Sequence, residues 1–264
     1  MKNSNTEIFR FSFIEAFDLL KKNLSIYFFS LSLVISVGLL QLVQRPNFET
    51  TSVSYAIFVL VSVLAMLVGL FLIALISLGW FGASVALLRD SYNTGKAMWT
   101  KLKQYLWTYI KRLFPLVILM GIVFVIQLGI LMKLDSRILL FLSDILSLTF
   151  MGPLYALIVI KDLSPFRGVS QTFNLLRKDV RFFLVLFFLY SANYFIVKAL
   201  GSVLDTFFNA ELFFSRLLLT RVPDLDSLLL SPVGVLFGTY ITAFTVVYLI
   251  KTTRTEQNTK IASN

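Results

Sequence analysis

Long apolar runs constrain this chain more than any other feature of its sequence. One run begins at Ser54 and meets no charged side chain before Arg89. About 20 apolar residues form a helix long enough to cross the ~30 Å hydrocarbon core of a bilayer. The composition agrees, because 58% of the 264 residues are hydrophobic and only 14% are charged, against about 25% in typical soluble domains. The sequence therefore predicts an all-α polytopic membrane protein.

Six transmembrane helices can be placed on these runs, arranged as three hairpins. The second run would be roughly 54 Å long as a helix, so we expect it to tilt or to extend beyond the bilayer. Gly79 and Gly82 predict a close contact or a bend in it. No clear small-residue cleavage site follows the first run, so we interpret it as a retained span and not as a signal peptide. The expected spans are residues 24–42, 54–89, 113–131, 138–160, 182–204 and 232–250.

Basic residues are distributed unequally between the two sides of these spans. With a cytoplasmic N-terminus, 18 Lys and Arg residues fall on the inner side and five on the outer side. This bias follows the positive-inside rule and places both termini in the cytoplasm. The charges flank apolar runs instead of forming a separate basic domain, which favours anionic lipid over nucleic acid as a partner. A protein partner or a homo-oligomer is also possible. The expected lipid contacts are Lys21, Lys22, Lys101, Lys103, Lys111, Arg112, Arg177, Lys178 and Arg181.

A segment of mixed apolar and basic residues occurs twice in the chain. AFDLLKKNL at residues 16–24 returns as TFNLLRKDV at residues 172–180. A third, weaker copy precedes the third span and carries Trp99 and Trp107. In helical form each copy places apolar residues on one face and basic or polar residues on the other. The predicted apolar stripes are Phe13, Phe17, Leu20 and Leu24 in the first copy, and Phe166, Val169, Phe173, Leu176 and Val180 in the second.

These copies predict a repeated unit, a cytoplasmic interfacial helix followed by a transmembrane hairpin. The units cover about residues 8–90, 91–162 and 163–252 of a single membrane domain, residues 1–264, and residues 253–264 form a short polar tail. The alternative is that the copies share only the amphipathic, basic character of any segment beside a membrane, without internal repetition.

Residues 151–189 carry a resemblance to a known family. The stretch MGPLYALIVIKDLSPFRGVSQTFNLLRKDVRFFLVLFFL resembles the membrane domain found beside some bacterial glycerophosphodiester phosphodiesterases, and related stand-alone six-span families of unknown function. Pro153 and the Ser164-Pro165-Phe166 turn fit the pattern, whereas Lys161 stands where the family has an acidic residue. In that family the chemistry belongs to a separate soluble barrel, for which the inner segments here are too short. The resemblance therefore implies architecture and no enzyme activity.

The chain lacks the residues of most catalytic and metal sites. It contains no Cys and no His, which excludes thiolate and imidazole chemistry and the usual zinc and iron–sulfur sites. It also shows no phosphate-binding loop, no nucleophile elbow and no suitably paired carboxylates. We expect no catalytic residue, no cofactor and no metal ion.

Polar residues inside the apolar runs are the remaining candidates for a site, because burying them in lipid is costly. Asp144 and Lys198 reach similar depths in the outer half of the membrane, Gln127 reaches a comparable level, and Asn193 lies deeper. An Asp144–Lys198 pair could line a proton or ion path. The alternative is a structural ion pair near the outer surface, with Lys198 extending towards headgroups.

Gly152-Pro153 predicts a kink midway along the fourth span. Broken helices at this depth sometimes bind a substrate, and others serve packing alone. The 18 inner basic residues and the three interfacial helices favour a non-enzymatic accessory protein that organises anionic lipid or partner proteins at the inner leaflet. The alternative function is a small transporter or permease with a polar site in the outer half of the bundle.

Overall fold

The computed structural model describes residues 2–43, 54–116, 118, 137–208 and 225–262. Every regular element in these residues is helical, so the described chain is all-α as predicted. The elements are α1 (Lys2–Lys22), α2 (Leu24–Val43), α3 (Ser54–Thr94), the 3-10 turn η1 (Trp99–Lys101), a helix that covers residues 102–116, α5 (Arg137–Ile160), α6 (Pro165–Lys178), α7 (Val180–Phe208) and α9 (Leu225–Ala262).

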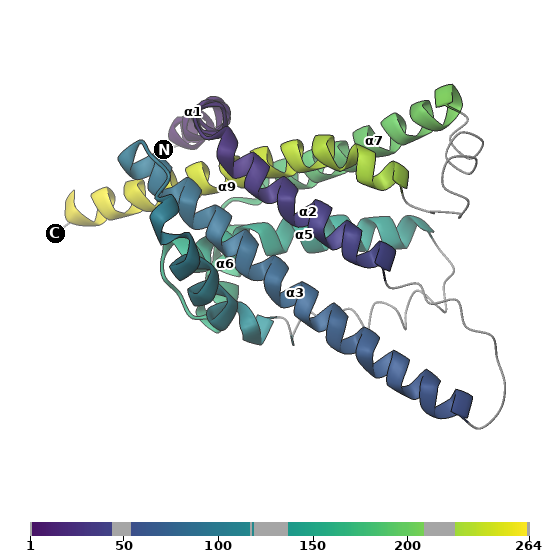
Figure 1. Cartoon of the computed structure of the whole chain (residues 1–264). Helices are drawn as coiled ribbons and strands as arrows, with labels where there is room; N and C mark the ends of the chain where they lie inside the picture. The colour runs from purple at the N-terminus through teal and green to yellow at the C-terminus, as the bar shows by residue number, and fades with distance from the viewer. Residues whose placement is uncertain (1, 44–53, 117, 119–136, 209–224, 263–264) are drawn as a thin grey trace.

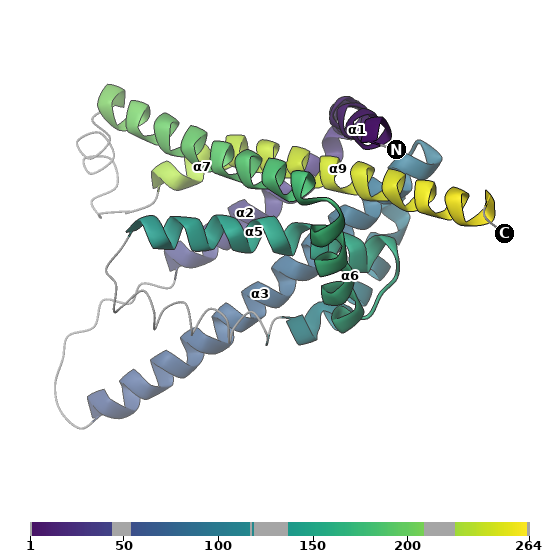
Figure 2. The same ribbon diagram turned by 180° about the vertical axis from the view of Figure 1, so that it is seen from behind.

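Helix α9 is the element on which the others assemble. It contacts α1, α2, α3, α5 and α7 and extends lengthwise through the bundle (Figure 1). Both termini lie at one end of the bundle, which we call the terminal end. Two amphipathic helices lie across this end: α1 is seen end-on in Figure 1, and α6 is turned across the direction of α5 and α7 in Figure 2.

Three segments among the described residues are long and apolar enough to cross a membrane: Phe141–Ile160 in α5, Val180–Val197 in α7 and Pro232–Thr255 in α9. They coincide with the fourth, fifth and sixth predicted spans, and they suggest a multi-pass membrane protein. Helices α2 and α3 form over the first and second predicted spans. Most of the third predicted span lies outside the described residues.

The buried core lies near the terminal end. It is formed by residues 83–88 of α3, 154–159 of α5 and 241–250 of α9. Phe182 of α7 stacks on Tyr248 of α9 with ring centroids 4.2 Å apart. Aromatic stacking of this kind stabilises a packed interface beyond its buried area, and here it ties α7 to α9 at the level of the core.

Gly79 and Gly82 mark a close helix contact, as the sequence predicted. A Cβ atom on Gly79 would come within 2.3 Å of Ile110 Cγ1, and one on Gly82 within 2.6 Å of Tyr109 Cβ. Both neighbours belong to the helix at residues 102–116. Small residues allow two helix backbones to approach closely, so these glycines let the helix at residues 102–116 pack closely on α3.

The predicted apolar stripe of α1 is partly wrong. Phe13 packs on the bundle, with its ring 5.1 Å from that of Phe244, but Phe17 is 61% exposed. The face turned to the bundle instead carries the buried Ser12 and Ala16, whose small side chains let α1 lie close to α9. Helix α1 therefore has two apolar faces, one packed and one exposed.

Helix α6 shows the same arrangement. Its buried residues are Gly168 and Thr172, and a Cβ atom on Gly168 would come within 2.5 Å of Ile158 Cγ1 in α5. Phe166, which belongs to the predicted stripe, is 80% exposed. Close packing through small residues again leaves large apolar side chains on the outer surface of a crosswise helix.

Candidate functional site

The terminal end carries a layer of polar contacts that joins distant helices. Glu15 of α1 accepts a hydrogen bond from the Tyr92 hydroxyl of α3 at 3.1 Å and an ion-paired hydrogen bond from Lys251 Nζ of α9 at 2.7 Å. Burial, followed by the nearby Glu15 carboxylate, raises the pKa of Tyr92 to about 12. One carboxylate therefore holds three helices together.

A second carboxylate, Asp90 at the end of α3, is held in the same way. It pairs with Arg89 at 3.0 Å and accepts a hydrogen bond from the Tyr105 hydroxyl. Arg89 also donates to the Val159 carbonyl of α5 at 3.0 Å. Burial, followed by the hydrogen bond to Asp90, raises the pKa of Tyr105 to about 12. These contacts join α3, the helix at residues 102–116 and α5.

Asp162 lies before α6 and Asp179 directly follows it, and each binds a residue of another helix. Asp162 has a φ of 54° in the turn after α5, a conformation that Asp tolerates better than most residues. It pairs with Arg112, whose hydrogen bond lowers the pKa of the carboxyl group. Asp179 accepts hydrogen bonds from the Tyr248 hydroxyl and from the Phe182 amide at 3.3 Å, so it also caps the start of α7.

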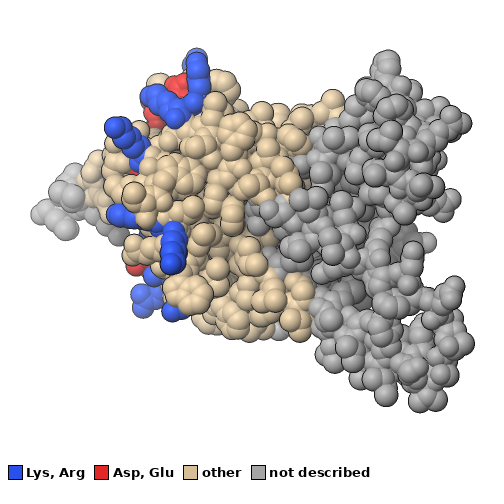
Figure 3. Space-filling view, in the orientation of Figure 1, with Lys and Arg blue, Asp and Glu red and all other residues tan. Residues whose placement is uncertain are grey.

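Basic and apolar side chains lie side by side on the outer surface of this layer. Phe17 on α1 is followed by the exposed Lys21 and Lys22. In the helix at residues 102–116, Trp107 is 61% exposed and Lys111 Nζ lies 4.8 Å from its ring centroid. Figure 3 shows that, on this face, the charged residues gather at the terminal end and that the band beside them carries neither Lys, Arg, Asp nor Glu.

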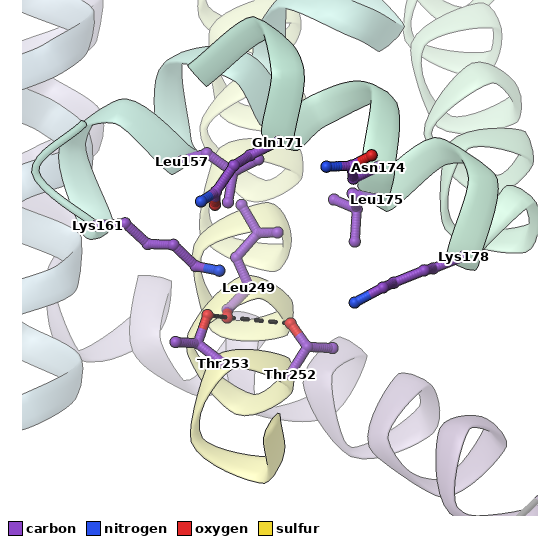
Figure 4. Close-up of a pocket in the computed structure, with 9 residues that line it drawn as sticks. All are labelled: Leu157, Lys161, Gln171, Asn174, Leu175, Lys178, Leu249, Thr252 and Thr253. Carbon is purple, nitrogen blue, oxygen red and sulfur yellow. Dashed lines mark hydrogen bonds between the residues drawn. The ribbon is translucent and has the colours of Figure 1, made fainter. Parts of the chain in front are cut away.

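A pocket opens between α5, α6 and α9 at the same end, with a volume of about 190 Å³. Lys161, in the turn after α5, and Lys178, the last residue of α6, extend into it (Figure 4). None of its nine described lining residues is acidic. The remaining polar lining residues are Gln171, Asn174, Thr252 and Thr253, and three leucines complete the wall.

Most of the predicted lipid contacts are exposed at the terminal end: Lys21, Lys22, Lys101, Lys103, Lys111, Arg177, Lys178 and Arg181. Arg112 differs, because its guanidinium already pairs with Asp162. We therefore leave Arg112 out of the lipid contacts proposed below.

The structure only partly places the predicted intramembrane polar site. Asp144 is exposed and lies three residues inside the apolar segment of α5, about 4.5 Å along a helix. Asn193 donates to the Gly234 carbonyl of α9 at 3.4 Å, and its buried Oδ1 has no hydrogen-bond partner in the described chain. Gln127 and the side chain of Lys198 lie outside the described residues, so the Asp144–Lys198 pair stays a prediction.

Gly152 and Pro153 lie within α5, which extends without interruption from Arg137 to Ile160. The Tyr190 hydroxyl of α7 lies 2.8 Å from the position that a Cβ atom on Gly152 would take. Gly152 therefore admits a close approach of α7, which is a packing role.

Sequence reasoning missed Lys161, Gln171, Asn174, Thr252 and Thr253 as parts of one pocket. The available signal was a lysine just after one apolar run and a threonine pair at the end of another, but spacing along the chain does not show that they meet.

No group of three or more potential metal ligands occurs among the residues described.

No protein-family model matches the chain, no curated protein matches it, and no solved structure matches it. The resemblance of residues 151–189 to the membrane domain of bacterial phosphodiesterases therefore stays a prediction.

Proposed function

We propose that this chain is a non-enzymatic accessory protein of the bacterial cytoplasmic membrane. In this proposal it crosses the bilayer six times, as three hairpins with both termini in the cytoplasm, and binds anionic lipid at the inner leaflet. It thereby organises lipid, or partner proteins that meet the same surface. The observation that carries the proposal is the arrangement at the terminal end, where crosswise helices expose basic and aromatic side chains together.

The physical chemistry of a membrane surface suits this arrangement. Aromatic rings such as those of Trp107 and Phe166 favour the boundary between headgroups and acyl chains, and both rings are exposed. Each Lys or Arg near an anionic leaflet contributes about 1 kcal/mol of attraction. Helices α1 and α6 lie across the bundle, which is the orientation of a helix that rests in the interface.

Lipid retention tests this proposal. The protein is placed in nanodiscs of equal phosphatidylglycerol and phosphatidylcholine, released, and the retained lipids are counted by native mass spectrometry. We expect a preference for phosphatidylglycerol that added salt weakens. A variant with Lys21→Gln, Lys22→Gln, Lys101→Gln and Lys103→Gln should lose several-fold of this preference.

The matched control changes the same four positions to Arg. It keeps every positive charge, so it should retain the preference of the wild-type protein. Equal retention of the two lipids by the wild-type protein would contradict the proposal.

One observation favours transport as a second function. Asn193 Oδ1 and Ser191 Oγ are buried in α7, and neither has a hydrogen-bond partner in the described chain. Unsatisfied polar atoms inside a membrane bundle are costly and often belong to a pathway for a polar solute. Proton flux into proteoliposomes, measured with an entrapped pH-sensitive dye and lost on Asn193→Leu, would favour this function.

A further inference from the structure

We propose that the pocket between α5, α6 and α9 binds the phosphoglycerol headgroup of an anionic phospholipid. This inference rests on the proposed function, since it names the lipid class and the site that selects it. The other basic residues of the terminal end attract any anionic surface, whereas this pocket would recognise one headgroup.

The charges of the pocket fit a phosphate group. Lys161 and Lys178 extend into the same cavity, and two ammonium groups facing one cavity create a local positive potential that favours an anion.

The hydrogen-bonding capacity of the pocket fits a ligand that also carries hydroxyl groups. Thr252 donates to the Tyr248 carbonyl at 3.0 Å, and Thr253 donates to the Leu249 carbonyl at 2.8 Å. Because each hydroxyl has a single proton, these two can only accept a hydrogen bond from a ligand. The lysine donors and the threonine acceptors line the same cavity (Figure 4) and together match a phosphate joined to glycerol.

The position and the size of the pocket agree with a lipid headgroup. The apolar segment of α5 ends at Ile160 and that of α9 ends at Thr255, so the pocket lies where the acyl region of a bilayer would give way to headgroups. Its volume of about 190 Å³ exceeds the ~150 Å³ cavity known to hold a benzene-sized molecule. Leu157, Leu175 and Leu249 supply an apolar wall for the carbon atoms that join the headgroup to its chains.

Binding to defined ligands tests the inference. The full chain in neutral detergent is titrated with phosphatidylglycerol, phosphatidic acid or phosphatidylcholine, and the shift in unfolding temperature gives each apparent affinity. We expect phosphatidylglycerol to bind most tightly. The Lys161→Gln, Lys178→Gln variant should bind it about tenfold or more weakly. Hydrogen bonds from an ammonium group to a phosphate are stronger than hydrogen bonds between neutral groups, and the variant loses them.

Two further variants make the test specific. Lys96→Gln with Arg167→Gln removes two exposed charges from the same end outside the pocket, and it should bind phosphatidylglycerol as the wild-type chain does. Thr253→Val keeps the shape of the side chain but removes its acceptor. It should lose the preference for phosphatidylglycerol over phosphatidic acid while both lipids still bind.

The outcomes separate this inference from the proposed function. If the wild-type chain selects phosphatidylglycerol and the Lys161→Gln, Lys178→Gln variant selects it equally well, the pocket assignment is overturned and the proposed function stands. The same result would show that the two lysines serve only to complement the C-terminal partial charges of α5 and α6. If the wild-type chain does not distinguish the lipids, the pocket assignment and the proposed function both fail. If soluble glycerol 1-phosphate raises the unfolding temperature as much as phosphatidylglycerol does, the conclusion that the ligand is a membrane lipid is overturned.

Discussion

At the scale of single residues, Glu15 and Tyr92 show how polar contacts can join distant helices at one end of an apolar bundle. The Tyr92 hydroxyl donates to Glu15, which also binds Lys251. The three residues come from α1, α3 and α9, so their contacts connect parts of the chain that are far apart in sequence. Because burial and the Glu15 carboxylate raise the pKa of Tyr92 to about 12, the protonated phenol is favoured in the folded state.

This shift predicts a dependence of stability on alkaline pH. A phenol with a raised pKa contributes stability that is fully present below its ordinary pKa of about 10 and is lost as the pH rises through its folded value. We expect Tyr92→Phe to be less stable than the wild-type protein at pH 8, where the hydrogen bond is lost. Between pH 10 and 12 the variant should lose stability less steeply, measured by denaturation in detergent.

The control is Phe17→Leu, because Phe17 is an exposed residue of α1 whose side chain has no titratable group. Its pH profile should keep the slope of the wild-type protein. A Tyr92→Phe profile parallel to that of the wild-type protein would contradict the prediction.

At the scale of elements, the contact between α3 and the helix at residues 102–116 depends on a glycine. A Cβ atom on Gly82 would meet Tyr109 Cβ at 2.6 Å, and that atom cannot turn away because it is fixed to the backbone. We expect Gly82→Ala to destabilise the protein by roughly 1–3 kcal/mol, as overpacking typically does. Thermal unfolding in detergent measures the effect.

Gly238 provides the matched control on α9, because a Cβ atom there would meet no described residue of another element within 4 Å. Alanine is a better helix former than glycine by about 1 kcal/mol, so Gly238→Ala should leave stability unchanged or raise it. Destabilisation of equal size at the two positions would show that helix contact is not the cause.

The elements show which parts of the fold a sequence can predict. The positions of α5, α7 and α9 follow from run length, because an apolar stretch that matches a bilayer leaves few alternatives to a helix. The rotation of α1 does not follow from its own pattern, because close packing on α9 selects Ala16 over the larger Phe17. The pocket is harder still, since Lys161, Lys178 and Thr253 meet only after three separate segments have packed.

At the scale of the whole molecule, the proposed six crossings place both termini on one side of the membrane. The chain contains no cysteine, so each introduced thiol can be labelled alone. Glu7→Cys and Asn258→Cys change exposed residues near the two termini, and Asn47→Cys changes the predicted outer connection between the first two spans. An impermeant maleimide added to intact cells should label only the Asn47→Cys variant.

Permeabilised cells supply the control, since all three variants should then be labelled. If only the three apolar segments of α5, α7 and α9 cross the membrane, an odd number of crossings separates the termini. In that case, intact cells would show labelling of one terminal variant and not the other, either Glu7→Cys or Asn258→Cys.

The central place of α9 has a consequence for how the protein is made. Five helices that contact α9 precede it in the chain, so a ribosome releases them before their shared packing surface exists. In the proposed membrane topology, the faces that later contact α9 meet lipid or the insertion machinery during this interval. Completion of the bundle is therefore a late event, and a message truncated before α9 would yield a membrane-inserted chain that quality-control proteases can recognise as unfinished.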